Sequence, residues 1–393
     1  MANILDYILW RGDLSFEMSP FNEVDNLILS KLAYLNFSGI VDKEIRRGVP
    51  LYRAAEIYFK EKREKIKNTG DLMGESFFEL LRLMANCKRY QHLKLKMYVE
   101  KMDMEEEKQF AAVTIDLGNR HLYVAYRGTD DTLVGWKEDL KMSVMDMIPA
   151  QREALEYLNK VAMRYRSYRL YIGGHSKGGN LAVFSAVHAT ERLKNRIVQV
   201  FNNDGPGFKE ALLDTQAYKM IANRIITLVP QSSIIGMLLE HDEDYIVVQS
   251  NQKGLLQHDG FSWEVCGTSF IHLKSITKQS QIIDRTIKRF LSGLSLEQRE
   301  QFTNVLFDIL CSNEKKTLTD IKGDSWKSVL GMIKTYDHLD KETKKAVMDT
   351  LASLFTEGIR SILEVRTPEQ WKDKMPKFQK SKIAEATKKT KEN

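Results

Sequence analysis

A serine at position 176 lies between glycines in a pattern that is typical of enzyme nucleophiles. Residues 174–178 read GHSKG and match G-x-S-x-G, with a strand-like run, YRLYIGG, before them and a helix-like run, NLAVFSAV, after them. A nucleophile on such a strand-to-helix turn exposes its oxygen, and the glycines let neighbouring backbone pack closely. The helix that begins behind the serine also favours developing negative charge. The pattern predicts that Ser176 is a nucleophile, with a glycine-rich packing turn as the alternative.

A second candidate element lies upstream, where residues 126–130 read YRGTD and follow a strand-like run. A carbonyl under attack needs two N–H donors aimed at its oxyanion. The backbone N–H of Lys177, just after the nucleophile, is one expected donor. The backbone N–H of Thr129, in a loop after an earlier strand, is expected to be the other. A plain turn capped by Asp130 and Asp131 is the alternative for this loop.

These two segments together resemble the class 3 lipase family of α/β hydrolases. The family pattern corresponds here to Arg127-Gly128-Thr129, Trp136, Asp139-Leu140 and the GHSKGG elbow at 174–179. A closer resemblance is to a bacterial family of lipase-like proteins that carry a domain of unknown function. The segments that carry it are FNEVDNLIL, YRGTDD, GGHSKGGNLA, FNNDGPGF, VPQSSIIGMLL and QHDGFSW. The resemblance covers roughly residues 1–270 and implies an α/β-hydrolase fold and a serine hydrolase, without supplying a substrate.

The base of such an enzyme is expected to be His258. In an α/β hydrolase the acid and the histidine follow the nucleophile in the chain, in the order Ser, Asp or Glu, His. His258 lies in LLQHDGFSWEV, between the last two strand-like runs, where a loop can reach the serine. A turn histidine beside Asp259-Gly260 is the alternative. The later histidines fall on the helix after the elbow, in an acidic loop, or at and past the end of the α/β region: His188, His241, His272 and His338.

The acid is expected to be Asp204, which ends the strand after the elbow helix in the segment FNNDGPG. In class 3 lipases the acid lies in an Asn-Asp-Pro segment after a later strand. The aligned stretch here, TLVPQ at 227–231, contains no acid, so the sequence departs from that family. A fixed carboxylate would hold the imidazole tautomer. Asp242 and Asp244 are the runners-up, and a turn-forming aspartate before Gly-Pro is the alternative for Asp204.

The expected substrate is a small-molecule acyl ester or a lipid-like ester. The apolar segment QSSIIGMLL at 231–239 falls between acid and base, where it would line an acyl pocket, form a lid or be a short core helix. The sequence has no H-E-x-x-H, cysteine pair or EF-hand loop, so no metal site is expected. It also has no P-loop or G-x-G-x-x-G in the right context, so we expect no cofactor.

Hydrophobic periodicity divides the chain into four regions. Residues 1–105 are predicted to be mostly helical and to pack on the core. Residues 106–275 alternate strands with helices, which predicts an α/β-hydrolase core with a mainly parallel sheet covered on both faces. An opening hairpin that turns at Gly118-Asn119 would add antiparallel strands at one edge. Residues 276–365 are predicted to form a helical region, and residues 366–393 a basic, flexible tail.

Composition limits the class of protein. With 43% hydrophobic residues, the 393-residue chain can bury a large core, so disorder throughout is excluded. No apolar run approaches the roughly 20 residues of a transmembrane helix, and the first residues do not read as a secretory signal. The three cysteines are odd in number and widely spaced, which fits a reducing cytoplasm. The expected location is therefore cytoplasmic.

The net charge of +6 is concentrated at the end of the chain, where residues 366–393 hold nine Lys or Arg and four Asp or Glu. A basic tail can contact nucleic acid or an anionic membrane surface. A solvated, frayed end is the favoured interpretation, with a weak membrane-surface contact as the alternative and no nucleic acid expected. The expected function is a serine hydrolase acting on an ester or thioester. A non-catalytic binding protein on the same scaffold is the alternative, and the oligomeric state is left open.

Overall fold

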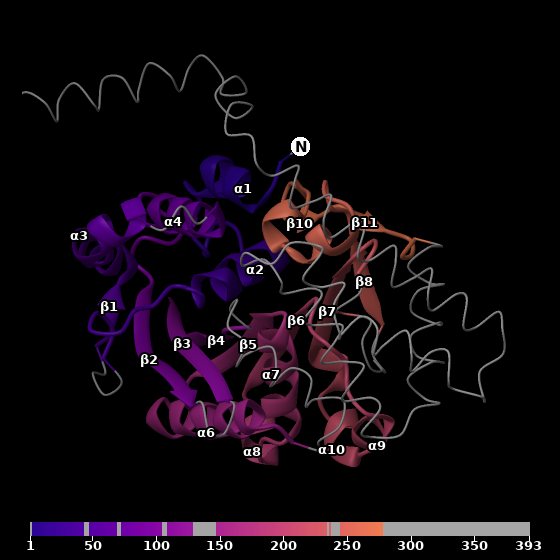
Figure 1. The fold of residues 1–393 in the computed structure, drawn as a ribbon. Coiled ribbons are helices and arrows are strands. Elements are labelled where there is room, and N and C mark those ends of the chain that lie inside the picture. The colour runs from indigo at the N-terminus through magenta and orange to yellow at the C-terminus, as the bar shows by residue number, and fades with distance from the viewer. Residues whose placement is uncertain are drawn as a thin grey trace, which may run out of the picture.

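The computed structural model describes residues 2–42, 47–68, 72–103, 108–128, 147–233, 236 and 244–277 (Figure 1). Three predictions lie outside these residues: the oxyanion donor Thr129, the helical region apart from 276 and 277, and the basic tail 366–393. The Trp136 and Asp139-Leu140 features of the lipase-like pattern lie outside them as well.

A nine-stranded sheet forms the centre of the described chain, in the order β1-β2-β3-β4-β5-β6-β7-β8-β11. Its strands are β1 (Val49–Pro50), β2 (Lys94–Asp103), β3 (Lys108–Gly118), β4 (His121–Tyr126), β5 (Arg169–His175), β6 (Ile197–Asn203), β7 (Ile225–Pro230), β8 (Tyr245–Val248) and β11 (His272–Leu273). The strands β9 (Val265–Cys266) and β10 (Ser269–Phe270) form a separate pair. Strands β4 to β8 run parallel, which confirms the predicted α/β class. Antiparallel strands extend both edges, not only the predicted one.

Two boundaries differ from those predicted. The sheet begins before residue 106, because β2 already pairs antiparallel with β3. The hairpin between β3 and β4 turns one residue later than expected, since Gly118 pairs with His121. The two turn residues, Asn119 and Arg120, have φ values of 46° and 58°. Positive φ at both central residues is what a two-residue hairpin of type I′ requires.

The helices that link the parallel strands cover one face of the sheet. Strands β4 to β8 are neighbours in chain order, and right-handed crossovers then place every linking helix on the same side. Along β4, Leu122, Val124 and Tyr126 pack in the core on that side. The elements there are α6 (Pro149–Arg164), α7 (Lys177–Val187), α8 (Glu191–Lys194), α9 (Glu210–Leu213), α10 (Gln216–Lys219) and the 3₁₀ turn η1 (Ala222–Arg224).

The opposite face is covered by the N-terminal helices, which lie together on the other side of the sheet from α6 and α8 (Figure 1). They are α1 (Ile4–Arg11), α2 (Glu23–Leu32), α3 (Leu51–Asn68) and α4 (Leu72–Ala85). The alternate residues of β4, Tyr123 and Ala125, pack with them. The N-terminal region therefore completes the hydrophobic core. Among the described helices, none has both the length and the apolar composition needed to cross a bilayer.

Candidate active site

Ser176 occupies a sharp turn between β5 and α7. Its backbone has φ 59° and ψ −134°, a conformation that costs a non-glycine residue free energy and that is typical of functional turns. The turn is tight: a Cβ on Gly174 would lie 2.3 Å from the carbonyl carbon of Gly178. The Ser176 N–H donates to Asn203 O at 2.9 Å. The serine hydroxyl makes no hydrogen bond to another described residue, His258 included, and Ser176 is partly exposed.

A buried polar network fastens α2 to the strand ends beneath this turn. Asn203, the last residue of β6, donates through Nδ2 to Gly174 O at 2.8 Å. Its Oδ1 accepts a hydrogen bond from Asn26 Nδ2 of α2 at 2.8 Å. Tyr123 of β4 donates to Asn26 Oδ1 at 2.7 Å, and all of these side chains are buried. Since buried polar groups are costly unless paired, the network fixes how α2 and the elbow lie together.

The predicted acid and base contact each other. Asp204 directly follows β6, and its side chain is fully buried. His258 ends the 3₁₀ turn η2 (Gly254–His258), and its Nδ1 lies 2.6 Å from Asp204 Oδ2. Because a carboxylate only accepts hydrogen bonds, Nδ1 carries the proton and the lone pair of a neutral His258 lies on Nε2. Ser176 and Asp204 follow His175 and Asn203, which pair on adjacent parallel strands. The sheet thus brings the nucleophile and the acid to one edge.

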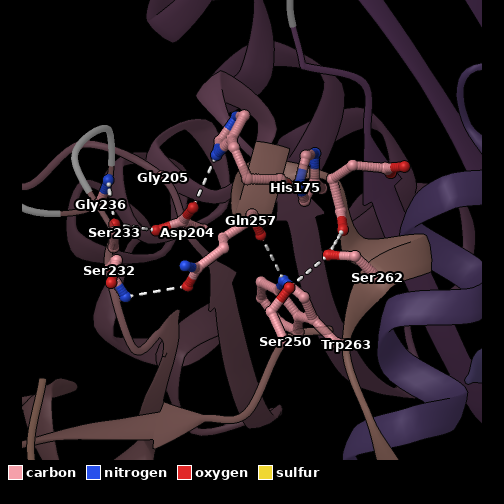
Figure 2. A network of polar contacts seen from close by, with 12 residues as sticks. His175, Asp204, Gly205, Ser232, Ser233, Gly236, Ser250, Gln257, Ser262 and Trp263 are labelled. Atoms are coloured by element: carbon pink, nitrogen blue, oxygen red, sulfur yellow. Dashed lines mark hydrogen bonds and ion pairs between the residues drawn. The ribbon is translucent and has the colours of Figure 1, made fainter. Parts of the chain in front are cut away.

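Ser233 is a partner of the acid that the sequence did not predict. Its hydroxyl donates to Asp204 Oδ1 and in turn accepts from the Gly236 N–H at 3.0 Å. Ser233 and Gly236 lie together beside Asp204 (Figure 2). A Cβ on Gly236 would lie 2.2 Å from Asp204 Oδ1, so only glycine fits there. The described part of the segment 231–239 therefore positions the acid. The only sequence feature that could have indicated this role is the pair of adjacent serines in an otherwise apolar run.

Hydrogen bonds from neighbouring residues fix the loop that carries His258. The Ser232 N–H donates to Gln257 Oε1 at 3.0 Å, and the buried Trp263 donates through Nε1 to Gln257 O at 2.9 Å (Figure 2). The Ser262 hydroxyl donates to Asp259 O at 2.6 Å. The last strand-like run of the α/β region, FSWEV at 261–265, is only partly a strand: the 3₁₀ turn η3 (Gly260–Ser262) occupies its start, and β9 begins at Val265. Asp259 N-caps this turn by accepting from the Phe261 N–H.

The other candidate residues lie elsewhere. Asp244 is exposed just before β8, and Asp242 lies outside the described residues. His188 stacks on Phe184 at the end of α7, with ring centroids 4.0 Å apart. His272 pairs with Glu23 at 2.7 Å. His241 and His338 also lie outside the described residues.

Backbone of the loop after β4 lies against the serine. A Cβ on Gly128 would lie 3.1 Å from Ser176 Cβ and 2.5 Å from His175 O, so this loop approaches the elbow as closely as glycine allows. Thr129, the predicted oxyanion donor, comes directly after it. Lys177 is the first residue of α7, and its buried ammonium donates to Gln109 O at 3.2 Å. The part of Lys177 that can face a substrate is therefore its backbone N–H.

A second histidine lies beside the base. The rings of His175 and His258 have centroids 4.7 Å apart, and His175 Nε2 lies 2.6 Å from His258 O. The Tyr34 hydroxyl lies 3.1 Å from His175 Nδ1. Burial lowers the pKa of His175 well below its usual value, and the positive charges of Lys31 and of a protonated His258 lower it further. His175 is therefore neutral in the folded protein.

This neutral histidine predicts acid sensitivity. An unfolded histidine takes up a proton near its ordinary pKa of about 6.5, whereas His175 in the folded chain does not. The unfolded state then binds more protons, so the free energy of unfolding should fall as the pH is lowered through that value. Urea unfolding as a function of pH measures the slope. His175→Gln lacks the titrating imidazole, so its free energy of unfolding should change less with pH. If it changes with pH as steeply as in the unmodified protein, His175 is not the group responsible.

Lys31 is a buried cation that holds the residue after the base. Its ammonium donates to Asp259 Oδ1 at 3.1 Å, and its side chain is 4% exposed against 48% for Asp259. The ammonium also lies 5.2 Å from the centre of the Phe261 ring and 5.7 Å from that of Phe77. Burial lowers the pKa of Lys31, while Asp259 opposes the shift. The lysine thus joins the end of α2 to the His258 loop.

Replacing Asp259 should destabilise the protein more than replacing Lys31. Asp259→Asn keeps the cap on η3 but leaves the Lys31 ammonium buried without a carboxylate. We expect a loss of about 1–2 kcal/mol in the free energy of unfolding, below the full cost of a completely buried pair because Asp259 is half-exposed. Lys31→Met removes the charge and keeps the packed stem, so its loss should be smaller. Urea denaturation of both variants measures the two losses in the free energy of unfolding. A loss in Lys31→Met as large as that in Asp259→Asn, or larger, would contradict this prediction.

Fold and site together define an α/β protein with a serine elbow and a buried acid–histidine pair at the carboxyl edge of its parallel strands. The family model of the Mbeg1-like proteins matches residues 84–308, more than half of the chain. The chain belongs to the Mbeg1-like family. No curated protein matches it.

Solved structures with some similarity carry the names of fungal lipases. Rhizomucor miehei lipase in its propeptide complex is 17% identical, with a TM-score of 0.31; the match covers 39% of this chain and 57% of that one. Lip2 lipase from Yarrowia lipolytica is 13% identical, with a TM-score of 0.33, over 51% of this chain and 78% of that one. The chain thus spans little more than half of the Rhizomucor miehei lipase.

Proposed function

We propose that the protein is a serine hydrolase of the lipase or esterase type that uses Ser176, His258 and Asp204. The observation that carries the proposal is the 2.6 Å contact between His258 Nδ1 and the buried Asp204, beside a serine held at positive φ on a strand-to-helix turn. An acid that fixes a histidine tautomer near a serine whose hydroxyl has no other described partner is the arrangement that activates a serine nucleophile. Structural packing alone does not require this set of side chains at one strand edge.

The reaction proceeds through an acyl-enzyme. Ser176 Oγ attacks the substrate carbonyl and forms the new C–O bond, while His258 Nε2 takes the serine proton. Asp204, held by Ser233, stabilises the imidazolium that forms. His258 then gives the proton to the leaving alcohol or thiol as its bond to the carbonyl carbon breaks. Water then attacks the acyl carbonyl and gives a proton to His258 Nε2, and His258 returns a proton to Ser176 Oγ as the acyl–serine bond breaks and the acid leaves.

The oxyanion is held by backbone N–H groups. The Lys177 N–H begins α7, so it combines a hydrogen-bond donor with the positive end of the helix dipole. The N–H of Thr129 is the proposed second donor, since the preceding residue, Gly128, packs against Ser176. The substrate class is a carboxylic ester or thioester, including lipid-like acyl compounds. No residue in this scheme needs a metal or a cofactor.

Labelling by a fluorophosphonate probe tests the proposal. The probe reacts covalently with an activated serine and needs no knowledge of the substrate. We expect labelling of the full chain at Ser176, located by mass spectrometry of the tryptic peptide. Absence of labelling in a folded sample would overturn the proposal and favour a binding protein on this scaffold. Labelling at another serine would overturn the assignment of Ser176.

A further inference from the structure

The main chain of His258 is held by the residue that precedes the nucleophile. His175 Nε2 lies 2.6 Å from the carbonyl oxygen of His258, and a carbonyl can only accept. His175 must therefore carry its proton on Nε2. The contact is buried on the His175 side, because this side chain is only 4% exposed. A short, buried hydrogen bond thus connects the elbow directly to the loop that carries the base.

Tyr34 contacts both the ring and the main chain of His175. With the proton on Nε2, His175 Nδ1 has a lone pair, and the Tyr34 hydroxyl lies 3.1 Å from it. The same hydroxyl donates to His175 O at 3.2 Å, so its one proton is shared between the carbonyl oxygen and Nδ1. Tyr34 follows α2 directly, and its main-chain N–H donates to Lys31 O at 3.1 Å. The end of α2 therefore supplies both Tyr34 and Lys31 to the surroundings of His258.

The proton on His175 Nε2 would be lost if the ring changed tautomer, and the acceptor on Nδ1 would be lost if the ring became charged. The groups that act on it are Tyr34 and Lys31 from the end of α2 and His258 from the loop after β8. Burial and the Lys31 charge lower the pKa of His175. These contacts keep one neutral form, with a donor toward His258 and an acceptor toward Tyr34.

From this geometry we infer that His175 is a positioning residue that sets the distance between Ser176 and His258. This inference rests on the proposed function. His175 directly precedes Ser176 in the chain. A hydrogen bond from its side chain to the main chain of His258 therefore fixes the position of the base relative to the nucleophile. Asp204 holds the same histidine by its ring. With its main chain and its ring both held, His258 has little freedom to move relative to Ser176.

Two substitutions of His175 distinguish a role in positioning His258 from a role in packing alone. His175→Gln places an amide N–H near the former Nε2 position, whereas the shorter His175→Asn places it near Nδ1 and cannot reach His258 O. We expect His175→Asn to lower kcat for a short p-nitrophenyl ester by about 10–100-fold, the effect of misplacing a catalytic group by roughly 1 Å. KM should change little, since His175 is not proposed to touch the substrate. His175→Gln should restore most of the activity.

His188→Asn is the matched control, because His188 stacks on Phe184 at the far end of α7 and should leave kcat unchanged. Circular dichroism and thermal unfolding show whether each variant is folded. ¹⁵N NMR of labelled histidine, assigned by difference against His175→Gln, should show His175 as a neutral imidazole protonated on Nε2.

The outcomes distinguish the inference from the proposed function. If the unmodified protein does not react with the fluorophosphonate probe, the proposed function fails and the kinetic comparison does not arise. If it reacts and His175→Asn reacts equally fast, the proposed function stands and the inference is wrong. A proton on Nδ1 of His175 in the NMR spectrum would also overturn the inference, whether or not the protein is a hydrolase.

Discussion

Ser176→Ala is expected to abolish hydrolysis of short p-nitrophenyl esters while leaving the fold intact. Only the attacking oxygen is lost, and the serine hydroxyl makes no hydrogen bond to another described residue. Residues of a triad act as a unit, so the expected fall in kcat is on the order of 10⁶-fold, with nearly equal damage from His258→Ala. Initial rates at saturating ester measure the effect, against a thermal unfolding curve of each variant.

A double variant tests whether Ser176 and His258 act together. If they share one step, Ser176→Ala with His258→Ala should be no slower than either single variant. Multiplicative losses would show two independent contributions. Retention of most of the activity in Ser176→Ala would assign the nucleophile to another residue.

Asp204→Asn is expected to lower kcat on the order of 10⁴-fold, because an amide in place of the carboxylate favours the wrong histidine tautomer. The change preserves shape, so the effect should appear in kcat without loss of the folded state. Fluorophosphonate labelling rates give a second measure of serine activation. The contact of the buried Asp204 with His258 Nδ1 at 2.6 Å is the reason for the large effect.

Two controls locate the acid. Ser233→Ala removes one hydrogen bond to Asp204 but leaves the carboxylate, so its loss of activity should be far smaller than that of Asp204→Asn. Asp244→Asn changes an exposed aspartate and should have little effect. Asp242→Asn serves as the remaining comparison. A large loss in Asp242→Asn or Asp244→Asn, with a mild Asp204→Asn, would place the acid in the later loop.

Local pattern was enough to predict the elements around the site. The G-x-S-x-G turn, the strand before it and the helix after it are neighbours in sequence, so their geometry follows from a few residues. Asp204 and His258 could be predicted from chain order, because the ends of consecutive parallel strands share an edge. The 2.6 Å contact between these two side chains lies where that order predicts it. Whether they act on Ser176 stays a prediction.

What the sequence could not predict depends on contacts between distant residues or on irregular backbone. Strand β2 was missed because its register with β3 shifts between Lys96 and Val99, where Met97 has φ 53°. The shift breaks the alternation that would indicate a strand, and buried Lys96 makes the segment look polar. Tyr34 was missed because no periodicity relates it to His175, which lies 141 positions later.

The long-range attachment of α2 has a consequence for how the chain reaches its native state. During synthesis the hydrogen bond of Asn26 cannot form until Asn203, 177 positions later, has been made. The ion pair of Lys31 likewise needs Asp259, 228 positions later. At typical rates of synthesis this delay is on the order of ten to fifty seconds. During that time Val24, Leu27 and Ile28, which are fully buried in the native protein, have only part of the sheet available to cover them. We expect the nascent chain to bind chaperones through α2 and the purified protein to refold slowly, as high contact order requires.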